Sequence, residues 1–218
     1  MLKTAVIIGS TGLIGNSLLG KMLANDNYKN VIALVRKPLL IHHPKLKVIE
    51  IDFENENENE LQNCLQGDDL FICTGSTMKK AGSKEAFRAI DFDLPLRIAT
   101  IASQNKMKKL LLISALGASV KSLFFYSKVK GELEQAVQLL PFASIFIFQP
   151  SILLGDRNEK RFLESVSQKI FRFLSFLFVG RLKKYAGTES YKVAESMIKQ
   201  ANSTLSGIHF INNETMLK

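Results

Sequence analysis

A tyrosine and a lysine four residues apart, Tyr126 and Lys130, form the pair in this sequence best suited to acid–base chemistry. Their spacing places both side chains on one face of the helix predicted for Lys121–Leu140. A phenol ordinarily has a pKa of about 10, and a nearby ammonium group favours the phenolate and lowers that pKa. The pair could therefore deliver a proton to a carbonyl oxygen, or remove one in the reverse direction.

Three glycines follow the first predicted strand and open a predicted helix. Gly9 permits a tight turn, Gly12 lets a pyrophosphate approach the backbone, and Gly15 lets the helix pack closely on the sheet. The helix N-terminus then presents unpaired N–H groups and a positive dipole end to phosphates. A turn that serves packing alone is the other interpretation. The predicted phosphate-binding residues are Gly9, Ser10, Thr11, Gly12, Leu13, Ile14 and Gly15.

The end of the second predicted strand bears on the choice of nucleotide. An acidic residue at this point favours NAD, whereas this chain has Arg36 and Lys37. A guanidinium can pair with a ribose 2′-phosphate through two charge-assisted hydrogen bonds, so Arg36 predicts NADP(H) as the cofactor. The alternative is that Arg36 is only a surface cation. Asp52, just past the third predicted strand, is a candidate for the adenine edge.

Short β-branched runs alternate with amphipathic stretches, which indicates βαβ units and a parallel sheet. Several runs are apolar almost throughout, as expected when helices cover both faces of the sheet. The predicted strands are Thr4–Ile8, Val31–Val35, Leu46–Ile51, Asp69–Cys73, Lys109–Ser114, Ala143–Phe148 and Gly207–Ile211. The pattern predicts an α/β fold with a doubly wound parallel sheet of the Rossmann type, in a single domain spanning residues 1–218.

The helices expected between these strands have several boundary signals. Apolar residues recur at helical spacing from Leu13 to Leu23. Residues 83–105 predict a helix with a bend or restart around Asp91 to Pro95, because proline disfavours a helix interior. A composition shift near Gly155 indicates that residues 156–206 contribute a small C-terminal cap.

The glycine turn, the Tyr126/Lys130 pair and the βαβ pattern resemble the short-chain dehydrogenase/reductase superfamily. Residues 71–87, 126–132 and 149–157 resemble its atypical branch, typified by the Tat-interacting-protein-like oxidoreductases and their bacterial relatives. The resemblance implies an NADPH-dependent reductase, or a related epimerase-like enzyme, acting on a small carbonyl substrate.

The same resemblance implies roles for individual residues. Tyr126 would be the acid/base, and Lys130 would also hold the nicotinamide ribose. The stretch Cys73, Thr74 and Gly75 would pass beside the adenosine ribose. The stretch Pro150, Ser151 and Ile152 would flank the nicotinamide.

One departure concerns the serine that polarises the substrate carbonyl. The superfamily often has a Ser-Ser pair after the fifth strand, whereas this chain has Ser114 followed by Ala115. Ser114 is the catalytic candidate, and Ser119 is the other hydroxyl that could take this role. The missing second serine favours a rival function, a non-catalytic NADPH-binding regulatory or assembly protein.

The bulk composition restricts the classes of partner. The 218 residues are 46% hydrophobic, which is typical of a soluble globular protein, and carry a formal net charge of +9, which favours anionic ligands. No nucleic-acid-binding signature accompanies this charge, so no nucleic acid is expected. No apolar run reaches the roughly 18 residues of a transmembrane segment. Cys64 and Cys73 lack metal-type spacing, so we expect no metal and a cytoplasmic location.

A segment rich in phenylalanine and cations, residues 162–184, has several interpretations. Core packing is one, and a wall of the substrate pocket is another. Contact with a membrane surface, or with a second copy in a homodimer, is a third.

Overall fold

The computed structural model describes residues 2–53, 58–151, 153–154 and 187–217. Its main sheet confirms all seven predicted strands, with bounds that differ by a few residues at most. They are β1 (Lys3–Ile8), β2 (Tyr28–Val35), β3 (Leu46–Glu50), β4 (Asp69–Ile72), β5 (Lys109–Ile113), β6 (Ser144–Gln149) and β9 (Gly207–Asn212). A short parallel pair, β7 (Leu153–Leu154) and β8 (Thr188–Glu189), lies apart from that sheet.

The sheet is parallel throughout, and its strand order is β3-β2-β1-β4-β5-β6-β9. The chain runs outward from β1 to β3, and then returns to place β4 on the other side of β1. The predicted doubly wound α/β fold is therefore confirmed. In such sheets ligands bind beyond the carboxyl ends of the strands where the order reverses, here between β1 and β4.

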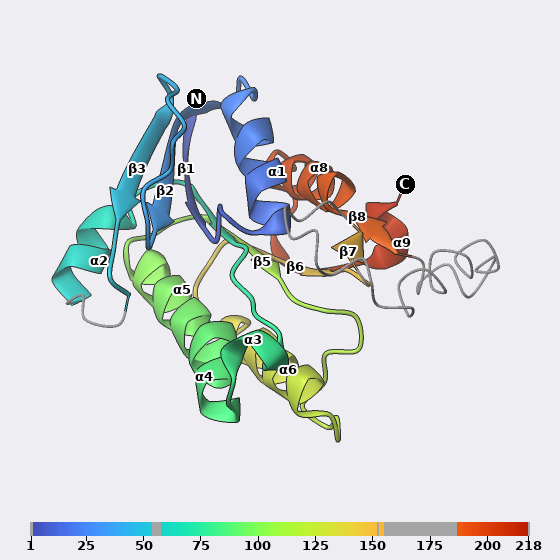
Figure 1. Ribbon diagram of the computed structural model, residues 1–218. Helices are drawn as coiled ribbons and strands as arrows, with labels where there is room; N and C mark the ends of the chain where they lie inside the picture. The colour runs from blue at the N-terminus through green and yellow to red at the C-terminus, as the bar shows by residue number, and fades with distance from the viewer. Residues whose placement is uncertain (1, 54–57, 152, 155–186, 218) are drawn as a thin grey trace.

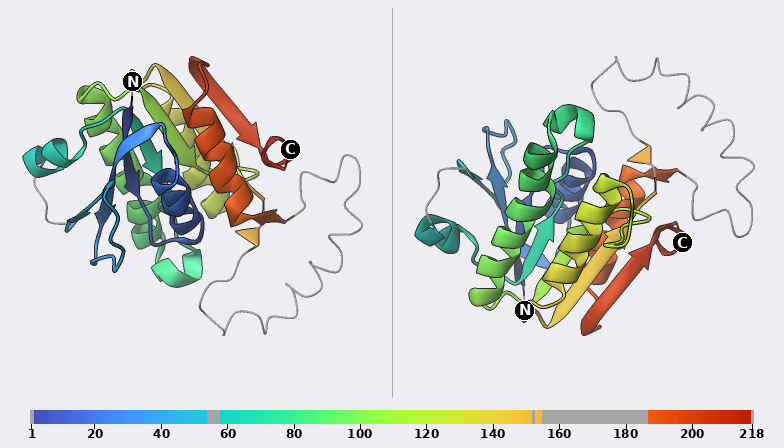
Figure 2. Two further views of the ribbon diagram at one scale, coloured as in Figure 1. Left: turned by 90° about the horizontal axis from the view of Figure 1, so that it is seen from above. Right: turned by 90° about the horizontal axis from the view of Figure 1, so that it is seen from below.

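Helices cover both faces of the sheet (Figures 1 and 2). One face carries α1 (Leu13–Leu23) and α8 (Ser190–Ala201), and the other carries α2 (Glu58–Cys64), α5 (Leu94–Gln104) and α6 (Phe125–Val137). Successive strand residues point to opposite faces. Ile7 accordingly packs with α1 and α8, while its neighbour Ile8 packs with the helices of the other face.

The helix predicted for residues 83–105 is interrupted, as expected. It consists of α4 (Lys84–Arg88), a π-helical turn η1 (Ala89–Asp93) and α5, which has Pro95 in its first turn. A π-turn inserts one residue and changes which side chains face a neighbouring helix. Here the turn buries Asp91 against α6.

The prediction that a helix starts at Lys121 is wrong, because α6 begins at Phe125. The cause is close packing. A Cβ at Gly131 would overlap the backbone of Ser119 and Val120, so α6 lies directly on the loop before it. The amide of Ser119 also donates to the carbonyl of Ser127 at 2.9 Å, which holds that loop against the helix.

In the C-terminal part of the chain, the structure describes residues 153–154 and 187–217. Helix α8 packs on α1, and the short helix α9 (Asn213–Met216) follows β9. Residues 155–186 lie outside the described residues, and so does the phenylalanine-rich segment 162–184. The cap predicted for 156–206 therefore stays a prediction. Within the described ranges no helix is long and apolar enough to cross a membrane.

Candidate functional site

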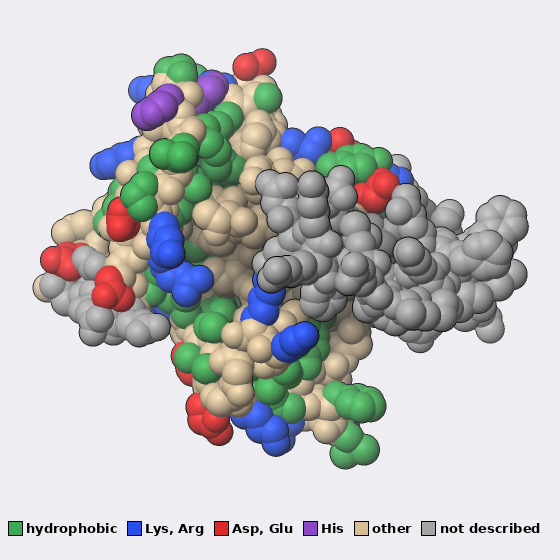
Figure 3. Space-filling model, in the orientation of Figure 1, with side chains coloured by type: hydrophobic (Ala, Val, Ile, Leu, Met, Phe, Trp, Pro, Cys, Tyr) green, Lys and Arg blue, Asp and Glu red, His purple; other side chains and the backbone are tan. Residues whose placement is uncertain are grey.

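A cleft of about 1060 Å³ lies beyond the carboxyl ends of the strands. In Figure 3, lysine and arginine side chains lie to the left of the central hollow and below it. Predicted site residues that line this cleft are Thr11, Gly12, Leu13, Ile14, Arg36, Cys73, Thr74, Gly75, Ser114, Tyr126 and Lys130. Their elements are far apart in sequence, and the parallel sheet brings their ends to one edge.

The glycine turn between β1 and α1 depends on very close backbone contacts. Gly9 has a φ of +79°, and a Cβ there would lie 2.6 Å from the carbonyl carbon of Cys73. A Cβ at Gly15 would overlap the carbonyl oxygen of Gly9. The turn is therefore held between the loop after β4 and the first turn of α1. Gly9, Ser10 and Gly15 shape the cradle without being among the residues that line the cleft.

The mouth of this turn fits a dinucleotide pyrophosphate. Gly12 is the N-cap of α1 and has no side chain with which to cap it. The first N–H groups of a helix have no partner inside the helix, and they attract phosphate oxygens. Within the described part of the chain, the buried hydroxyls of Ser10 and Thr74 also have no hydrogen-bond partner. The helix N–H groups and the hydroxyl of Thr74, which lines the cleft, could hold the phosphates.

The two predicted contacts with the adenosine end differ in position. Arg36 directly follows β2, is exposed, and lines the cleft. Asp52 follows β3 and is exposed, but it does not line the cleft. Loss of hydration raises the pKa of the Cys73 thiol to about 12, so Cys73 contributes a neutral group.

A buried ion pair connects three walls of the cleft. Lys130 Nζ lies 2.8 Å from Asp91 Oδ1, and both side chains are almost completely buried. The backbone N–H of Ser76 donates to Asp91 Oδ2 at 2.8 Å. One carboxylate thus ties the loop after β4 and helix α6 to the π-turn. A Cβ at Gly75 would lie 3.5 Å from Asp91 Oδ1, so this loop passes directly over the pair.

Tyr126 lies beside the ion pair, and its ring packs on Phe87 with a centroid distance of 5.5 Å. Burial raises the pKa of Tyr126, Lys130 lowers it in part, and Asp91 raises it again. The expectation that the ammonium group leaves this phenol with a lowered pKa is therefore wrong in direction. Desolvation of the ring and the carboxylate beside Lys130 together outweigh the ammonium charge.

Ser114 follows β5 and donates its hydroxyl hydrogen to Glu134 Oε1 over 2.5 Å. Gln149 Nε2 donates to Glu134 Oε1 and Oε2 at 2.9 and 3.2 Å. Burial raises the pKa of Glu134, while these hydrogen bonds and Lys130 lower it in part. The alternative serine, Ser119, is exposed and does not line the cleft.

The predicted nicotinamide-flanking residues are only partly placed. The carbonyl of Pro150 accepts from Leu116 N at 2.9 Å, so Pro150 joins the loops after β5 and β6. The amide of Ser151 donates to Asn213 Oδ1 at 3.3 Å. Neither Pro150 nor Ser151 lines the cleft, and Ile152 lies outside the described residues.

Two acidic residues of the site were absent from the sequence prediction. Asp91 follows the buried Phe87 by four residues, which places a carboxylate on an apolar helix face. This unusual placement could have identified Asp91 from the sequence. Glu134 extends the Tyr126 and Lys130 spacing by another four residues, and therefore shares their face of α6. That spacing alone could have identified Glu134.

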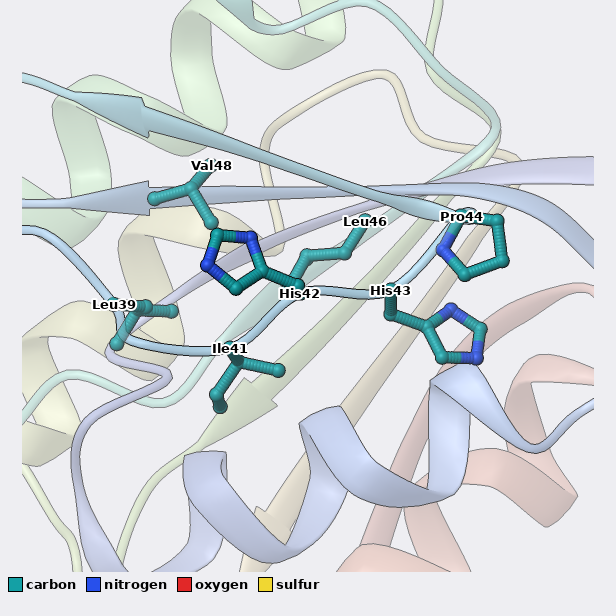
Figure 4. Close-up of a pocket in the computed structure, with 7 residues that line it drawn as sticks. All are labelled: Leu39, Ile41, His42, His43, Pro44, Leu46 and Val48. Atoms are coloured by element: carbon teal, nitrogen blue, oxygen red, sulfur yellow. The ribbon is translucent and has the colours of Figure 1, made fainter.

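A second hollow, of about 540 Å³, lies between β3 and the loop before it (Figure 4). Its lining is mostly apolar and comprises Leu39, Ile41, His42, His43, Pro44, Leu46 and Val48. None of the cleft residues described above contributes to it. We therefore assign the candidate site to the larger cleft.

Sequence comparisons support this assignment. A family model described as NAD(P)H-binding matches residues 9–138. The chain is 34% identical over 173 residues to Protein HTATIP2 of Rattus norvegicus, which covers 78% of this chain and 70% of that protein. It is 31% identical over 193 residues to the mitochondrial protein FMP52 of Candida albicans, which covers 86% of this chain and 84% of that protein.

Solved structures share the fold at low sequence identity. MoeE5 in complex with UDP-glucuronic acid and NAD superposes with a TM-score of 0.72 at 16% identity, over 96% of this chain and 75% of that chain. The oxidoreductase ylbE from Lactococcus lactis has a TM-score of 0.66 at 17% identity, over 98% and 95% of the two chains. Both confirm the Rossmann-type architecture.

The glycine turn makes a direct prediction for two substitutions in α1. Gly15→Ala forces a methyl group into the Gly9 carbonyl, so it should destabilise the fold by about 1–3 kcal/mol and weaken dinucleotide binding. Gly20→Ala has open space and should stabilise the helix by about 0.5–1 kcal/mol. Denaturant unfolding and NADPH titration measure both effects. If the two variants have the same stability and the same NADPH affinity, the close contact at Gly15 constrains neither the fold nor the nucleotide site.

Proposed function

This chain belongs to the NAD(P)H-binding family, within the atypical branch of the short-chain dehydrogenase/reductases, and on that premise we propose that it is an NADPH-dependent reductase of small carbonyl compounds. The observation that carries the proposal is one cleft that holds three functional parts. These are the uncapped N-terminus of α1, the Tyr126 phenol and the Lys130 ammonium group.

In the proposed reaction the cofactor, when bound, supplies a hydride to the carbonyl carbon. Tyr126 donates its phenolic proton to the carbonyl oxygen, so that a C=O group becomes a CH–OH group. Lys130 stabilises the resulting phenolate through its positive charge. Asp91 holds the Lys130 side chain in place through the ion pair.

The raised pKa of Tyr126 favours one direction of this reaction. A phenol whose pKa exceeds its ordinary value stays protonated at neutral pH, and is ready to act as an acid. The reverse reaction needs the phenolate as a base, which becomes abundant only at high pH. The protonated phenol is the form that carbonyl reduction requires.

Arg36 supports the choice of NADP(H) over NAD(H). It directly follows β2 and lines the cleft, and its guanidinium could pair with a 2′-phosphate. We propose the cytoplasm as the location, because the two cysteines lack metal-type spacing and a reducing compartment suits such a chain.

A non-catalytic NADPH-binding regulatory or assembly protein is the second candidate function. Two observations favour it: Lys130 is already paired with Asp91, and Ser114 donates to Glu134 rather than into the cleft. Ala115 supplies no hydroxyl in its place. Turnover of carbonyl compounds with NADPH distinguishes the two functions, because a regulator would bind the nucleotide without consuming it.

Replacement of Tyr126 tests the proposed proton donor. Tyr126→Phe should lower kcat for a reducible carbonyl compound by at least about 100-fold, because the variant lacks the transferable proton. NADPH affinity should stay unchanged. Tyr191→Phe, at an exposed position on α8, is the matched control and should retain full activity. Retained turnover in Tyr126→Phe would reject this mechanism.

Reversal of charge at Arg36 tests the cofactor preference. Arg36→Asp should weaken NADPH binding by about 10-fold or more and change NADH binding far less, because only NADPH carries the 2′-phosphate. Lys37→Asp makes the same charge change one residue away, outside the cleft lining. Both affinities follow from fluorescence titration. Parallel losses for the two nucleotides in Arg36→Asp would count against NADP(H) specificity.

The pH dependence of alcohol oxidation tests the electrostatic role of Asp91. Asp91→Asn removes a charge that raises the pKa of Tyr126 while Lys130 remains. The rise of kcat/KM with pH for NADP⁺-dependent oxidation should therefore move to lower pH, by on the order of one unit. Asp93→Asn, an exposed position in the same π-turn, should leave the profile in place. A shift to higher pH in Asp91→Asn would contradict this assignment.

A further inference from the structure

The hydroxyl of Ser114 acts as a hydrogen-bond donor to one protein group in this structure, Glu134. A serine hydroxyl offers one hydrogen and two lone pairs. The hydrogen of Ser114 is donated to Glu134 Oε1. Ser114 also lines the cleft. Ser114 is 4% exposed, and because its hydrogen is used by Glu134, the lone pairs of its oxygen are what remain for a hydrogen bond with a bound substrate.

The surroundings of Glu134 keep Ser114 in this orientation. Gln149 donates to both carboxylate oxygens, so two neighbouring side chains supply hydrogens to Glu134. Glu134 is only 6% exposed, and little water can replace a lost donor. Turning the Ser114 hydrogen toward the cleft would remove a hydrogen bond to a buried carboxyl group, and such a loss is unfavourable.

An acceptor at this position is a poor partner for a carbonyl oxygen and a good one for a hydroxyl. Ala115 adds no donor beside Ser114. Tyr126 is the donor for the reacting oxygen under the proposed function, so Ser114 is left to recognise a different substrate group. That group must carry a hydrogen of its own.

We propose that Ser114, oriented by Glu134, selects carbonyl substrates that carry a hydroxyl group next to the reacting carbonyl. The substrate class is then hydroxyketones and hydroxyaldehydes. The inference rests on the proposed reductase function and narrows it. Ser114 is the specificity-determining residue, and Glu134 is a positioning residue that acts through it.

Three ketones of equal chain length test the selection: a 1-hydroxy-2-alkanone, its 1-methoxy analogue and the unsubstituted 2-alkanone. The methoxy compound keeps the oxygen but lacks its hydrogen. In the wild-type protein kcat/KM with NADPH should be about 5- to 10-fold higher for the hydroxyketone than for the methoxyketone. A preference for the methoxyketone or for the unsubstituted ketone would overturn the proposal.

Glu134→Gln provides the decisive variant. The amide replaces one acceptor oxygen with a donor NH2 group and removes the charge, so Ser114 is no longer held as a donor by a carboxylate and its hydrogen can turn toward the cleft. The hydroxyketone preference should then fall to about 1 or reverse, because Ser114 becomes a donor to the methoxy oxygen. Glu132→Gln makes the same change two residues earlier on α6, where the side chain pairs with Arg88 near the surface. This control should retain the wild-type ratio.

The remaining outcomes separate this inference from the proposed function. Ser114→Ala should lose the preference without gaining a new one, and it serves as the test if Glu134→Gln does not fold. An unchanged substrate ratio in the folded Glu134→Gln variant would overturn the proposal while leaving the reductase function standing. Absence of turnover for all three ketones would reject the reductase function instead. Calorimetric binding of the hydroxy- and methoxyketones to the NADP(H)-loaded protein then decides the selection, and equal affinities would reject it.

Discussion

The contact between Gly15 and the carbonyl of Gly9 is the constraint on which the site depends. It leaves no room for a Cβ, and so fixes the start of α1 directly above the end of β1. The same turn packs on the backbone of Cys73 and Thr74, which places the loop after β4 beside the helix N-terminus. The positive end of α1, the buried hydroxyls and the cleft therefore occupy a position set by backbone packing.

The second organising feature is a row of ionisable side chains along α6. Tyr126, Lys130 and Glu134 share one helix face, and each has its partner on a different element. Asp91 from the π-turn pairs with Lys130, and Ser114 from the end of β5 donates to Glu134. These contacts hold the tyrosine protonated and the serine as an acceptor. Under the proposed function, the cleft gives a proton to a carbonyl oxygen and binds a neighbouring hydroxyl.

Much of this arrangement could be predicted from the sequence. Apolar strands and the glycine spacing are local signals, and they predicted all seven sheet strands and the glycine turn between β1 and α1. The predicted start of α6 was wrong because Gly131 packs on Ser119 and Val120, and helix periodicity does not reveal this contact. The predicted direction of the Tyr126 pKa shift was wrong because burial of the phenol raises its pKa, and Asp91, which lies 39 residues before Lys130, raises it further. The burial of these side chains and their long-range charge pairs could be identified only from the structure.

The most direct test of the account is titration of the wild-type protein with NADPH, followed by nucleotide fluorescence at constant ionic strength. The cradle at the N-terminus of α1 predicts saturable binding of one nucleotide per chain. A cooperative thermal transition in the same sample establishes that the protein is folded. Absence of saturable NADPH binding to the folded protein would contradict the nucleotide site, and with it the proposed reaction.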